Sequence, residues 1–462
     1  MVTETGVTIP FYVRGELLDD PVVAFEPRDG APFTTPRLDL DSLVWPRTQP
    51  LPLAEVPVAE IIDVLAATGE RLRDDRDGLL TDALNSLSRT SPYERRILEN
   101  SYAKLWQSFQ ADYLRATLIG ELGGAAVLDG WCRNEGVDGR GGYVRAYPTR
   151  LVHILAGNSP GVAAYTVVKG ALMKGVHLLK LPSNDLLTAT AILRTLAAVA
   201  PGHPVAQSFA AVYWRGGDES VESVLYRPQF FDKLVAWGGE AAIQSAVQYL
   251  GPGFELIAFD PKNSISMVGR EAFGSDSKLR EVAALAATDA TSHNQEACTS
   301  SRFQFVEGSL EEVDRYCELL QAELGLERPL SSAVVAPPPA ALREEVEAMR
   351  LMDALYRVFG AADGRGLVVR SSEPVGFFPS NKTVNVVAVD SLADAVKFVT
   401  VSTQTVGIYP AERKLELRDN LAAAGVQRVV NLGGGGGAGL IGLAHDGFFP
   451  MHRFVRWVND ED

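Results

Sequence analysis

The sequence predicts an α/β protein with two doubly wound α/β domains and a small β arm. Strand-like and helix-like segments alternate from residue 151 to 249 and again from 278 to 400. Such alternation implies right-handed crossovers and parallel sheets with helices on their faces. A further segment, 131–148, carries glycines between strand-like flanks and favours a hairpin. In sheets of this kind, ligands bind beyond the carboxyl ends of the strands.

The elements are expected in this order along the chain. Residues 1–55 are rich in proline, valine and acidic residues and predict an N-terminal arm of strands and loops, and apolar residues then take helical spacing to about residue 128. The first alternating region predicts strands over 151–156, 176–181, 210–214 and 233–237, and helices over 160–174, 185–199 and 240–249. The second predicts helices over 278–288, 310–324 and 392–400, and strands over 302–306 and 384–389.

The composition excludes several classes of protein. The 462 residues are 46% hydrophobic and 22% charged, which is typical of a globular chain rather than a disordered one. With 43 basic and 58 acidic residues the net charge is −15, which argues against a nucleic-acid partner. No apolar run is long enough to predict a membrane span, and the first 30 residues lack a secretory signal. Three cysteines, Cys132, Cys298 and Cys317, are too few for a disulfide framework or a zinc site, so we expect a cytoplasmic protein.

Cys298 is the leading candidate for chemistry. It follows the polar run 293–297 and precedes the strand-like segment 303–306. A thiol at such a junction has a fixed backbone behind it and open space in front, as an attacking thiolate requires. A lone intracellular cysteine is more often a small core residue. The asparagine, glutamine, glutamate, threonine, serine and arginine around it are not typical of a core segment, and they favour the reactive interpretation.

The glycine-rich run 433–439 contains the pattern G-x-G-x-x-G twice, after a strand-like segment at 428–432. A dinucleotide-binding fingerprint also needs a helix, a second strand and an acidic residue about 20 positions further on. Only residues 443–462 remain, and they include Pro450. We therefore expect a flexible loop that closes over a site, rather than a dinucleotide site.

Two other segments are better candidates for a cofactor. Lys180, with Ser183 and Asn184 in the turn that follows, stands at the carboxyl end of a predicted strand, where it can hold a ribose or its phosphate. A solvated lysine at a strand end is the competing interpretation. Trp237, Gly238 and Gly239 join a strand to a helix N-terminus, where free N–H groups favour a pyrophosphate, although a tight turn would look the same.

Two single residues complete the candidate set. Asn158 follows the first clear strand, and its amide can donate to a developing oxyanion, but turn asparagines are common. Glu255 is a lone carboxylate in an apolar run. It is either an acid or base with a raised pKa or an edge residue that reaches water. No set of histidine, cysteine and carboxylate residues has the spacing of metal ligands.

The order Asn158, Lys180, Gly238-Gly239, Glu255 and Cys298 resembles that of the aldehyde dehydrogenase superfamily, from about residue 100 to the end of the chain. The chain is most similar to one branch, the acyl-CoA reductases of the LuxC type, which include the fatty-acyl reductase of bacterial bioluminescence. Three stretches carry this similarity: 155–161, 294–300 and 445–458. Departures are the segment 373–378, which scrambles a pattern of the aldehyde-oxidising members, Gly239 in place of a serine, and a long spacing from Glu255 to Cys298.

The resemblance implies an aldehyde-dehydrogenase-like fold in four parts. Residues 1–55 would be an N-terminal arm, and residues 56–258 a nucleotide-binding domain with a hairpin arm at about 128–150. Residues 259–432 would be the catalytic domain that carries Cys298, and residues 433–462 a glycine-rich loop and C-terminal segment that complete an oligomerisation arm. A homodimer or homotetramer is therefore expected.

The resemblance also implies NADPH-dependent reduction of an acyl thioester, a fatty acyl group above all, to the aldehyde. Cys298 would be the nucleophile, Asn158 an oxyanion donor, and Lys180, Ser183, Asn184, Trp237, Gly238 and Gly239 the cofactor-binding residues. NADPH is preferred over NADH because no acidic residue is well placed after Lys180. The acyl donor would be acyl-CoA or an acyl-carrier thioester, and an acyl-delivering synthetase or carrier protein is an expected partner.

Three alternatives stay open. A hydrolytic aldehyde dehydrogenase would use Glu255 as the base for deacylation, with a water between Glu255 and Cys298. A non-catalytic subunit would hold the acyl group on Cys298 for a partner enzyme. A reductase of the glutamyl-phosphate type would act on acyl phosphates and would need a small polar pocket.

Overall fold

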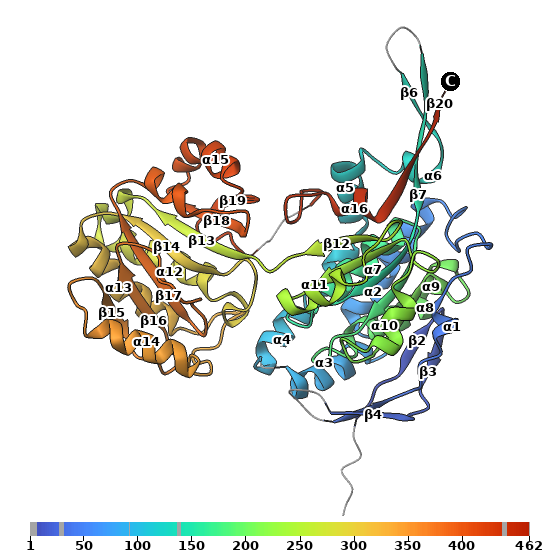
Figure 1. The fold of residues 1–462 in the computed structure, drawn as a ribbon, viewed down its shortest axis with the longest axis horizontal. Helices are drawn as coiled ribbons and strands as arrows, with labels where there is room; N and C mark the ends of the chain where they lie inside the picture. The colour runs from blue at the N-terminus through green and yellow to red at the C-terminus, as the bar shows by residue number, and fades with distance from the viewer. Residues whose placement is uncertain (1–6, 27–31, 92, 136–139, 437–440, 462) are drawn as a thin grey trace, which may run out of the picture. The chain divides into compact units, whose positions relative to one another are not determined.

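A computed structural model of the chain describes residues 7–26, 32–91, 93–135, 140–436 and 441–461 (Figure 1). The chain divides into two compact units. Unit 1 contains Met1–Asp260 together with Ile441–Asp462, and unit 2 contains Pro261–Leu440. Each unit is built around a seven-stranded sheet whose strands are mainly parallel, which confirms the predicted α/β fold class.

The sheet of unit 1 has the order β12-β11-β8-β9-β10-β2-β3. Its five parallel strands are β8 (Arg150–Ile154), β9 (Val176–Lys180), β10 (Phe209–Val212), β11 (Lys233–Trp237) and β12 (Glu255–Phe259). Two antiparallel strands from the N-terminus, β2 (Phe11–Val13) and β3 (Glu16–Leu18), extend the sheet beyond β10. Phe11 and Tyr12 are buried there, so this part of the N-terminal segment belongs to the core of unit 1.

Helices surround this sheet. The longer ones are α2 (Val58–Asp74), α3 (Leu79–Thr90), α4 (Arg95–Tyr102), α5 (Ala111–Leu122), α7 (Gly161–Leu172), α8 (Thr188–Val199), α10 (Glu219–Leu225) and α11 (Glu240–Val247). Short helices are α1 (Leu40–Leu43), η1 (Leu105–Phe109), α6 (Ala126–Asp129), α9 (Pro204–Gln207) and α16 (Pro450–Phe454). Gly69 lets α2 and η1 pack closely, because a Cβ at this position would lie 2.6 Å from the Cβ of Phe109.

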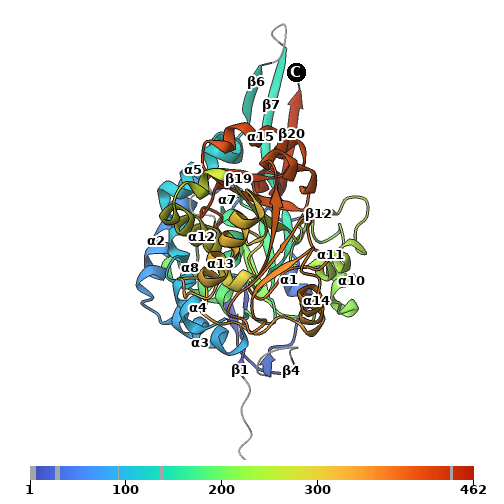
Figure 2. The same cartoon turned by 90° about the vertical axis from the view of Figure 1, so that its left-hand side faces the viewer.

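Two small sheets complete unit 1. The first consists of β1 (Val7–Thr8), β5 (Phe33–Thr35) and β4 (Val23–Phe25). The second joins β6 (Cys132–Glu135) and β7 (Gly141–Pro148) to the C-terminal strand β20 (Val455–Glu461), all antiparallel. In Figures 1 and 2 these three strands extend away from the main sheet of their unit. The predicted tip of this hairpin, at 136–139, lies outside the described residues.

The sheet of unit 2 has the order β15-β16-β17-β14-β13-β18-β19, and only the pair β15–β16 is antiparallel among these described strands. Its strands are β13 (Asn263–Val268), β14 (Ser301–Glu307), β15 (Arg357–Gly360), β16 (Leu367–Ser371), β17 (Thr383–Val389), β18 (Thr403–Tyr409) and β19 (Arg428–Asn431). Its helices are η3 (Arg270–Gly274), α12 (Asp276–Ala290), η4 (Ser292–Gln295), α13 (Leu310–Leu324), α14 (Ala340–Arg350), η5 (Leu392–Phe398) and α15 (Arg413–Ala423).

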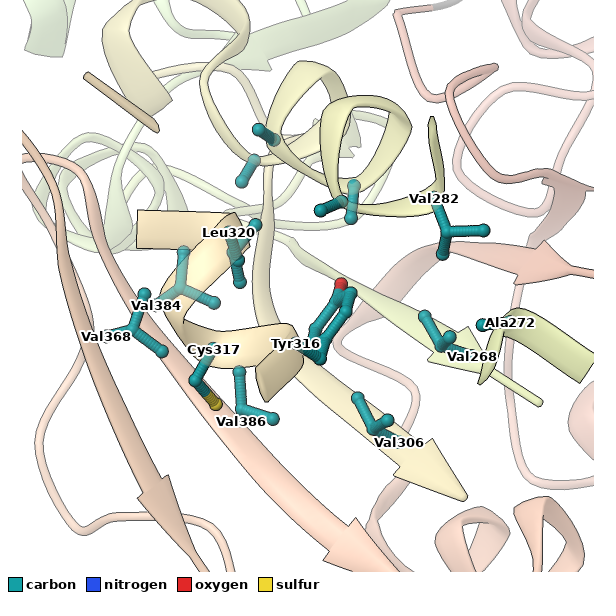
Figure 3. Packing of buried hydrophobic residues seen from close by; sticks show 14 of the residues in the cluster. Val268, Ala272, Val282, Val306, Tyr316, Cys317, Leu320, Val368, Val384 and Val386 are labelled. Atoms are coloured by element: carbon teal, nitrogen blue, oxygen red, sulfur yellow. The ribbon is translucent and has the colours of Figure 1, made fainter. Parts of the chain in front are cut away.

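Alternating side chains bury both faces of this sheet, as expected for a doubly wound fold. On β17, Val384 and Val386 pack with α12 and α13, whereas Val387 packs with η5 and α15 on the other face. Figure 3 shows the first of these clusters, with Tyr316 and Cys317 of α13 directed into it. Cys317 is therefore a core residue, and burial raises the pKa of its thiol. Among the described residues, no helix is both long and apolar enough to cross a membrane.

Candidate active site

Cys298 lies in unit 2, on an exposed loop between α12 and β14. The loop is fixed from the interior, because the Ser264 hydroxyl at the start of β13 donates to the carbonyl oxygen of Cys298 at 2.8 Å. Ser264 in turn accepts a hydrogen bond from the backbone N–H of Thr405 on β18 at 3.2 Å. Strand interiors therefore hold the backbone of Cys298 while its side chain faces outward, the arrangement that a nucleophilic thiol requires.

The polar run before Cys298 is a strained turn. His293, Asn294 and Gln295 have φ angles of 48°, 55° and 75°, in the left-handed region that non-glycine residues rarely adopt. Three consecutive residues of this kind persist only where the surroundings fix them, and they are typical of functional sites. The side chain of Gln295 is buried and donates to the Thr383 carbonyl at 2.8 Å, which anchors the turn to β17.

Arg302 anchors the same loop from its other side. Its guanidinium donates to the carbonyl oxygens of Gln295 and Pro379, the latter at 2.6 Å, and packs 4.3 Å from the ring centroid of Phe378. Burial lowers its pKa to about 10, so it stays charged at neutral pH. The segment 373–378, which departs from the superfamily pattern, thus contributes Phe378 to packing around this loop.

The glycine-rich segment also lies beside the cysteine loop, within unit 2. The buried carboxylate of Asp289, on α12, accepts hydrogen bonds from the N–H groups of Gly433 and Gly435, each at 2.8 Å. A Cβ at Gly435 would lie 2.8 Å from Asp289 Oδ1 and 3.4 Å from the carbonyl oxygen of Thr299, next to Cys298. Hydrogen bonds to Asp289 therefore hold the start of the glycine-rich run beside the cysteine loop. Residues 437–440 lie outside the described part of the chain.

In unit 1, Lys180 ends β9 and is buried. Its ammonium lies 5.9 and 5.7 Å from the ring centroids of Tyr213 and Trp214, just beyond the end of β10. Burial lowers the pKa of Lys180 to about 8, and the carboxylate of Glu222 opposes that shift. Lys180 is thus a desolvated cation at the carboxyl edge of the sheet, not the solvated lysine of the competing interpretation.

The turn after Lys180 contacts the loop of Asn158. The Asn184 amide donates to the Gly157 carbonyl at 3.0 Å, and any side chain at Gly157 would overlap Asn184. Asn158 itself is exposed between β8 and α7, and Ser183 is half-buried in the turn. The acidic residue that follows, Asp185, is buried and accepts the hydroxyl of Thr188 at 2.6 Å, so its carboxylate is engaged inside the chain.

An aromatic cluster lies at the carboxyl ends of β11 and β12. Trp237 stacks on Phe259 with ring centroids 3.6 Å apart, and His445 and Tyr165 meet Trp237 at 5.5 and 5.4 Å. The buried Trp237 Nε1 and Tyr165 Oη have no hydrogen-bond partner among the described residues. Beyond Trp237, Gly238 has a φ of 152°, and Gly239 is the N-cap residue of α11, with nothing within 4 Å of a Cβ placed on it.

Glu255 lies at the other end of these strands, where the parallel strands of the sheet begin. It is the first residue of β12, in register with Lys233, the first residue of β11, whereas Phe259 at the other end pairs with Trp237. Its carboxylate binds Lys233 at 2.9 Å and the guanidinium of Arg453. Burial alone would raise its pKa, but these two cations lower it below the usual value. The carboxylate of Glu255 is therefore engaged by two cations and lacks the raised pKa that the sequence analysis considered for an acid or base.

The structure therefore groups the predicted residues in two sets, one in each unit. The set in unit 1 lies at the carboxyl ends of the parallel strands and consists of Asn158, Lys180, Ser183, Asn184, Trp237, Gly238 and Gly239. Cys298 is the predicted residue that lies in unit 2. Together with Arg302, Asp289 and Ser264 position the cysteine loop, and sequence patterns indicated neither of these two residues. Their partners are distant in sequence, 146 residues for the contact between Asp289 and Gly435. In the described part of the chain, no group of three histidine, cysteine or acidic residues could hold a metal ion.

Comparison with known proteins agrees with the predicted family. A model of the acyl-CoA reductase (LuxC) family matches residues 53–457. The long-chain acyl-protein thioester reductase of Aliivibrio fischeri is 32% identical over 350 residues, which cover 74% of this chain and 69% of that protein. The enzyme of the same name from Vibrio harveyi is 28% identical over 422 residues, covering 88% and 84%.

Solved structures with a similar fold include dehydrogenases that act on aldehydes. The lactaldehyde dehydrogenase of Escherichia coli superposes with a TM-score of 0.72 at 14% identity, covering 99% of both chains. At that identity the similarity concerns the fold alone, and it confirms the aldehyde-dehydrogenase-like architecture.

Proposed function

We propose that this chain, which belongs to the acyl-CoA reductase (LuxC) family, reduces an acyl thioester to the aldehyde with NADPH through a covalent acyl-Cys298 intermediate. The observation that carries the proposal is the exposed thiol of Cys298 on a strained loop that hydrogen bonds attach to β13 and β17, with β18 contributing through Ser264. The names of the relatives, long-chain acyl-protein thioester reductases, support a fatty acyl group carried on a protein thiol, with acyl-CoA as the other candidate donor.

In the first half of the reaction, the Cys298 thiolate attacks the carbonyl carbon of the thioester. The new C–S bond forms, the bond to the carrier sulfur breaks, and the carrier leaves as a thiol after taking up a proton. The acyl group is now a thioester of Cys298. The amide of Asn158 and the backbone N–H of Cys298 are the proposed donors to the oxyanion of the tetrahedral intermediate.

In the second half, the acyl-Cys298 thioester becomes a thiohemiacetal, and the nicotinamide supplies the hydride for this step when bound. Hydride addition leaves the thiohemiacetal as its alkoxide, whose C–S bond then breaks, so that the aldehyde leaves and the Cys298 thiolate is regenerated. Neither half requires an activated water. The engagement of the Glu255 carboxylate by Lys233 and Arg453 supports a reaction in which this residue does not act as a deacylating base.

The residues of unit 1 fit a nicotinamide dinucleotide. The open backbone at Gly239 leaves room for a pyrophosphate at the N-terminus of α11, where the helix dipole favours negative charge. Lys180, with Ser183 beside it, offers a cation for a ribose phosphate, which favours NADPH over NADH. Asp185 does not compete for ribose hydroxyls, because its carboxylate already binds Thr188.

We also propose that the chain forms a homodimer or homotetramer through the sheet of β6, β7 and β20. The three strands pair with each other and leave the outer edges of β6 and β20 without a neighbouring strand among the described residues. An exposed edge of this kind is a template for pairing with another chain. A strict monomer in solution would contradict this part of the proposal.

The test follows nicotinamide absorbance with NADPH and either long-chain acyl-CoA or an acyl-carrier thioester. We compare the wild type with Cys298→Ala and with Cys132→Ala, a matched control that removes a half-buried cysteine of unit 1. NADPH consumption that disappears in Cys298→Ala and persists in Cys132→Ala is expected, together with acylation of Cys298 detected by mass spectrometry.

Two results would overturn the proposal. Aldehyde oxidation to the acid without any thiol acceptor, in the absence of thioester reduction, would make the protein a hydrolytic dehydrogenase. Acylation of Cys298 without any nicotinamide turnover would make it an acyl-holding subunit.

A further inference from the structure

Arg428, the first residue of β19, ties the glycine-rich segment to the sheet of unit 2. Its Nη1 donates to the Gly435 carbonyl at 2.9 Å and its Nη2 to the Gly434 carbonyl at 3.2 Å. Asp289 binds the N–H groups of Gly433 and Gly435 in the same stretch. One charged side chain therefore holds the carbonyl groups of this stretch and another holds its N–H groups, which fixes both charges in space.

Two routes of contact lead from Arg428 to the cysteine loop. Through the glycines, Gly435 lies against the carbonyl oxygen of Thr299, the residue after Cys298. Through the strands, Arg428 Nη1 also donates to the Thr405 hydroxyl at 3.3 Å, and the N–H of Thr405 binds the Ser264 hydroxyl that holds the Cys298 carbonyl. The guanidinium of Arg428 therefore belongs to the hydrogen-bond network that holds the backbone of Cys298.

The guanidinium of Arg428 is partly desolvated, and one of its N–H donors is unused in the described part of the chain. Burial lowers the pKa of the guanidinium, while the negative charges of Asp289 and of the Cys298 thiolate raise it. An arginine remains protonated at neutral pH despite such a shift. Its Nε is buried and has no hydrogen-bond partner among the described residues. Because the attraction between two charges is mutual, a thiolate that favours charged Arg428 is itself favoured by Arg428.

Other charged groups surround this loop. His293 and Glu296 belong to the turn before Cys298, and Arg302 follows it, but the guanidinium of Arg302 is occupied by the carbonyls of Gln295 and Pro379. Burial raises the pKa of Asp289 to about 6, against the lowering effect of the two glycine N–H groups. Above that pH the carboxylate is charged and opposes part of the effect of Arg428.

We propose that Arg428 is a positioning residue that stabilises the thiolate form of Cys298 through its fixed charge while it holds the glycine-rich segment in place. The inference rests on the proposed role of Cys298 as the nucleophile. No other cation on β18 or β19 is tied to this segment by hydrogen bonds in the described part of the chain. At Gly435, the close packing against Asp289 and Thr299 leaves no room for a side chain.

The test measures the rate at which iodoacetamide alkylates Cys298 as a function of pH, by mass spectrometry of the Cys298 peptide. Alkylation requires neither thioester nor cofactor, so this inference and the proposed function can fail independently. Arg428→Gln keeps a donor for the glycine carbonyls but removes the charge, whereas Arg428→Lys keeps the charge. Arg418→Gln, at an exposed arginine of the same unit, is the matched control.

We expect the apparent pKa of the Cys298 thiol to rise by about one unit in Arg428→Gln, so that alkylation near neutral pH slows about tenfold. Arg428→Lys and Arg418→Gln should alkylate at nearly the wild-type rate. Equal effects of the Gln and Lys substitutions, or a wild-type profile in Arg428→Gln, would overturn the inference. If Arg428→Gln fails to fold, the wild type still decides, because a Cys298 pKa at or above the ordinary value of about 8.5 contradicts a stabilised thiolate.

Discussion

Replacement of Glu255 by glutamine separates a catalytic role from a structural one. Glu255 and Phe259 are the two ends of β12, four residues apart, and Phe259 is in register with Trp237 at the carboxyl edge. At about 3.3 Å per residue, this places Glu255 roughly 13 Å from that edge. A general base must come within hydrogen-bond reach of the group that it deprotonates, directly or through one water. We therefore expect Glu255→Gln to leave the rate of thioester reduction nearly unchanged.

The same substitution should have a measurable effect on stability. The Glu255 carboxylate binds Lys233, whose ammonium also donates to the carbonyls of Arg453 and Val455, and it binds Arg453 itself. The side chain of Glu255 is 41% exposed, so solvent screens both ion pairs. Pairs at such exposure contribute about 0.2–1 kcal/mol each. We expect a loss of about 1 kcal/mol and a decrease in Tm of roughly 2–4 °C.

The assay combines steady-state kcat for aldehyde formation with a thermal unfolding curve. The matched control is Glu60→Gln, which removes another exposed carboxylate of unit 1 in contact with a single histidine, His203. A decrease in kcat of about 10²-fold or more in Glu255→Gln, with Tm unchanged, is the signature of a lost general base. That result would refute the structural argument and restore the role predicted from the sequence.

Three further predictions follow from the ionisable groups of unit 1. Lys180 carries its charge below a pKa of about 8, so the Kd of NADPH measured by fluorescence should increase above pH 8, and Lys180→Met should remove this dependence without a similar change for NADH. Buried His177, which contacts His153 at 3.0 Å, has a pKa lowered to about 3 from about 6.5 in the unfolded chain. The contribution of neutral His177 to the free energy of unfolding is therefore fully present above pH 6.5, and it decreases as pH falls from 6.5 toward 3, by up to about 1.4 kcal/mol per pH unit. A Tm that stays constant over this pH range would contradict this prediction. Lys169→Met leaves the buried Glu121 carboxylate without its cation and should cost about 3–5 kcal/mol, and the double variant Glu121→Gln/Lys169→Met should recover much of that loss.

The sequence predicted the architecture because the signals for it are local. Strand-like runs such as 176–181 and helical spacing such as 310–324 report the burial of their own side chains, and the parallel sheets follow from their alternation. The pairing of β2 with β10 left no such trace. Tyr12 lies opposite Ala211, almost 200 residues away, and a short apolar run near the N-terminus does not reveal its partner. The arm predicted for residues 1–55 is therefore partly a continuation of the main sheet.

The site divides in the same manner. Cys298, Lys180 and Gly238 could be found because each stands at a strand boundary with a distinctive side chain or none. Glu255 stood out as a carboxylate in an apolar run, but the sequence did not reveal that Arg453, 198 residues further on, would bind it. The positions of Asp289 and Arg428 beside the cysteine loop could not be predicted from the sequence for a related reason. The glycines that they bind and the cysteine loop beside these glycines are brought together only by the fold of unit 2.

The carboxylates of the two units bear on the choice between reduction and hydrolysis. An acyl thioester on Cys298 must persist until hydride reaches it, and a carboxylate free to activate water would shorten its life. Asp289, beside the cysteine loop, accepts two backbone N–H groups and faces the charge of Arg428, so its oxygens are already occupied. Glu255 is held by two cations at the amino edge of its own sheet. With their oxygens engaged in this way, neither Asp289 nor Glu255 is free to activate a water, which supports the proposed reduction through an acyl-Cys298 thioester.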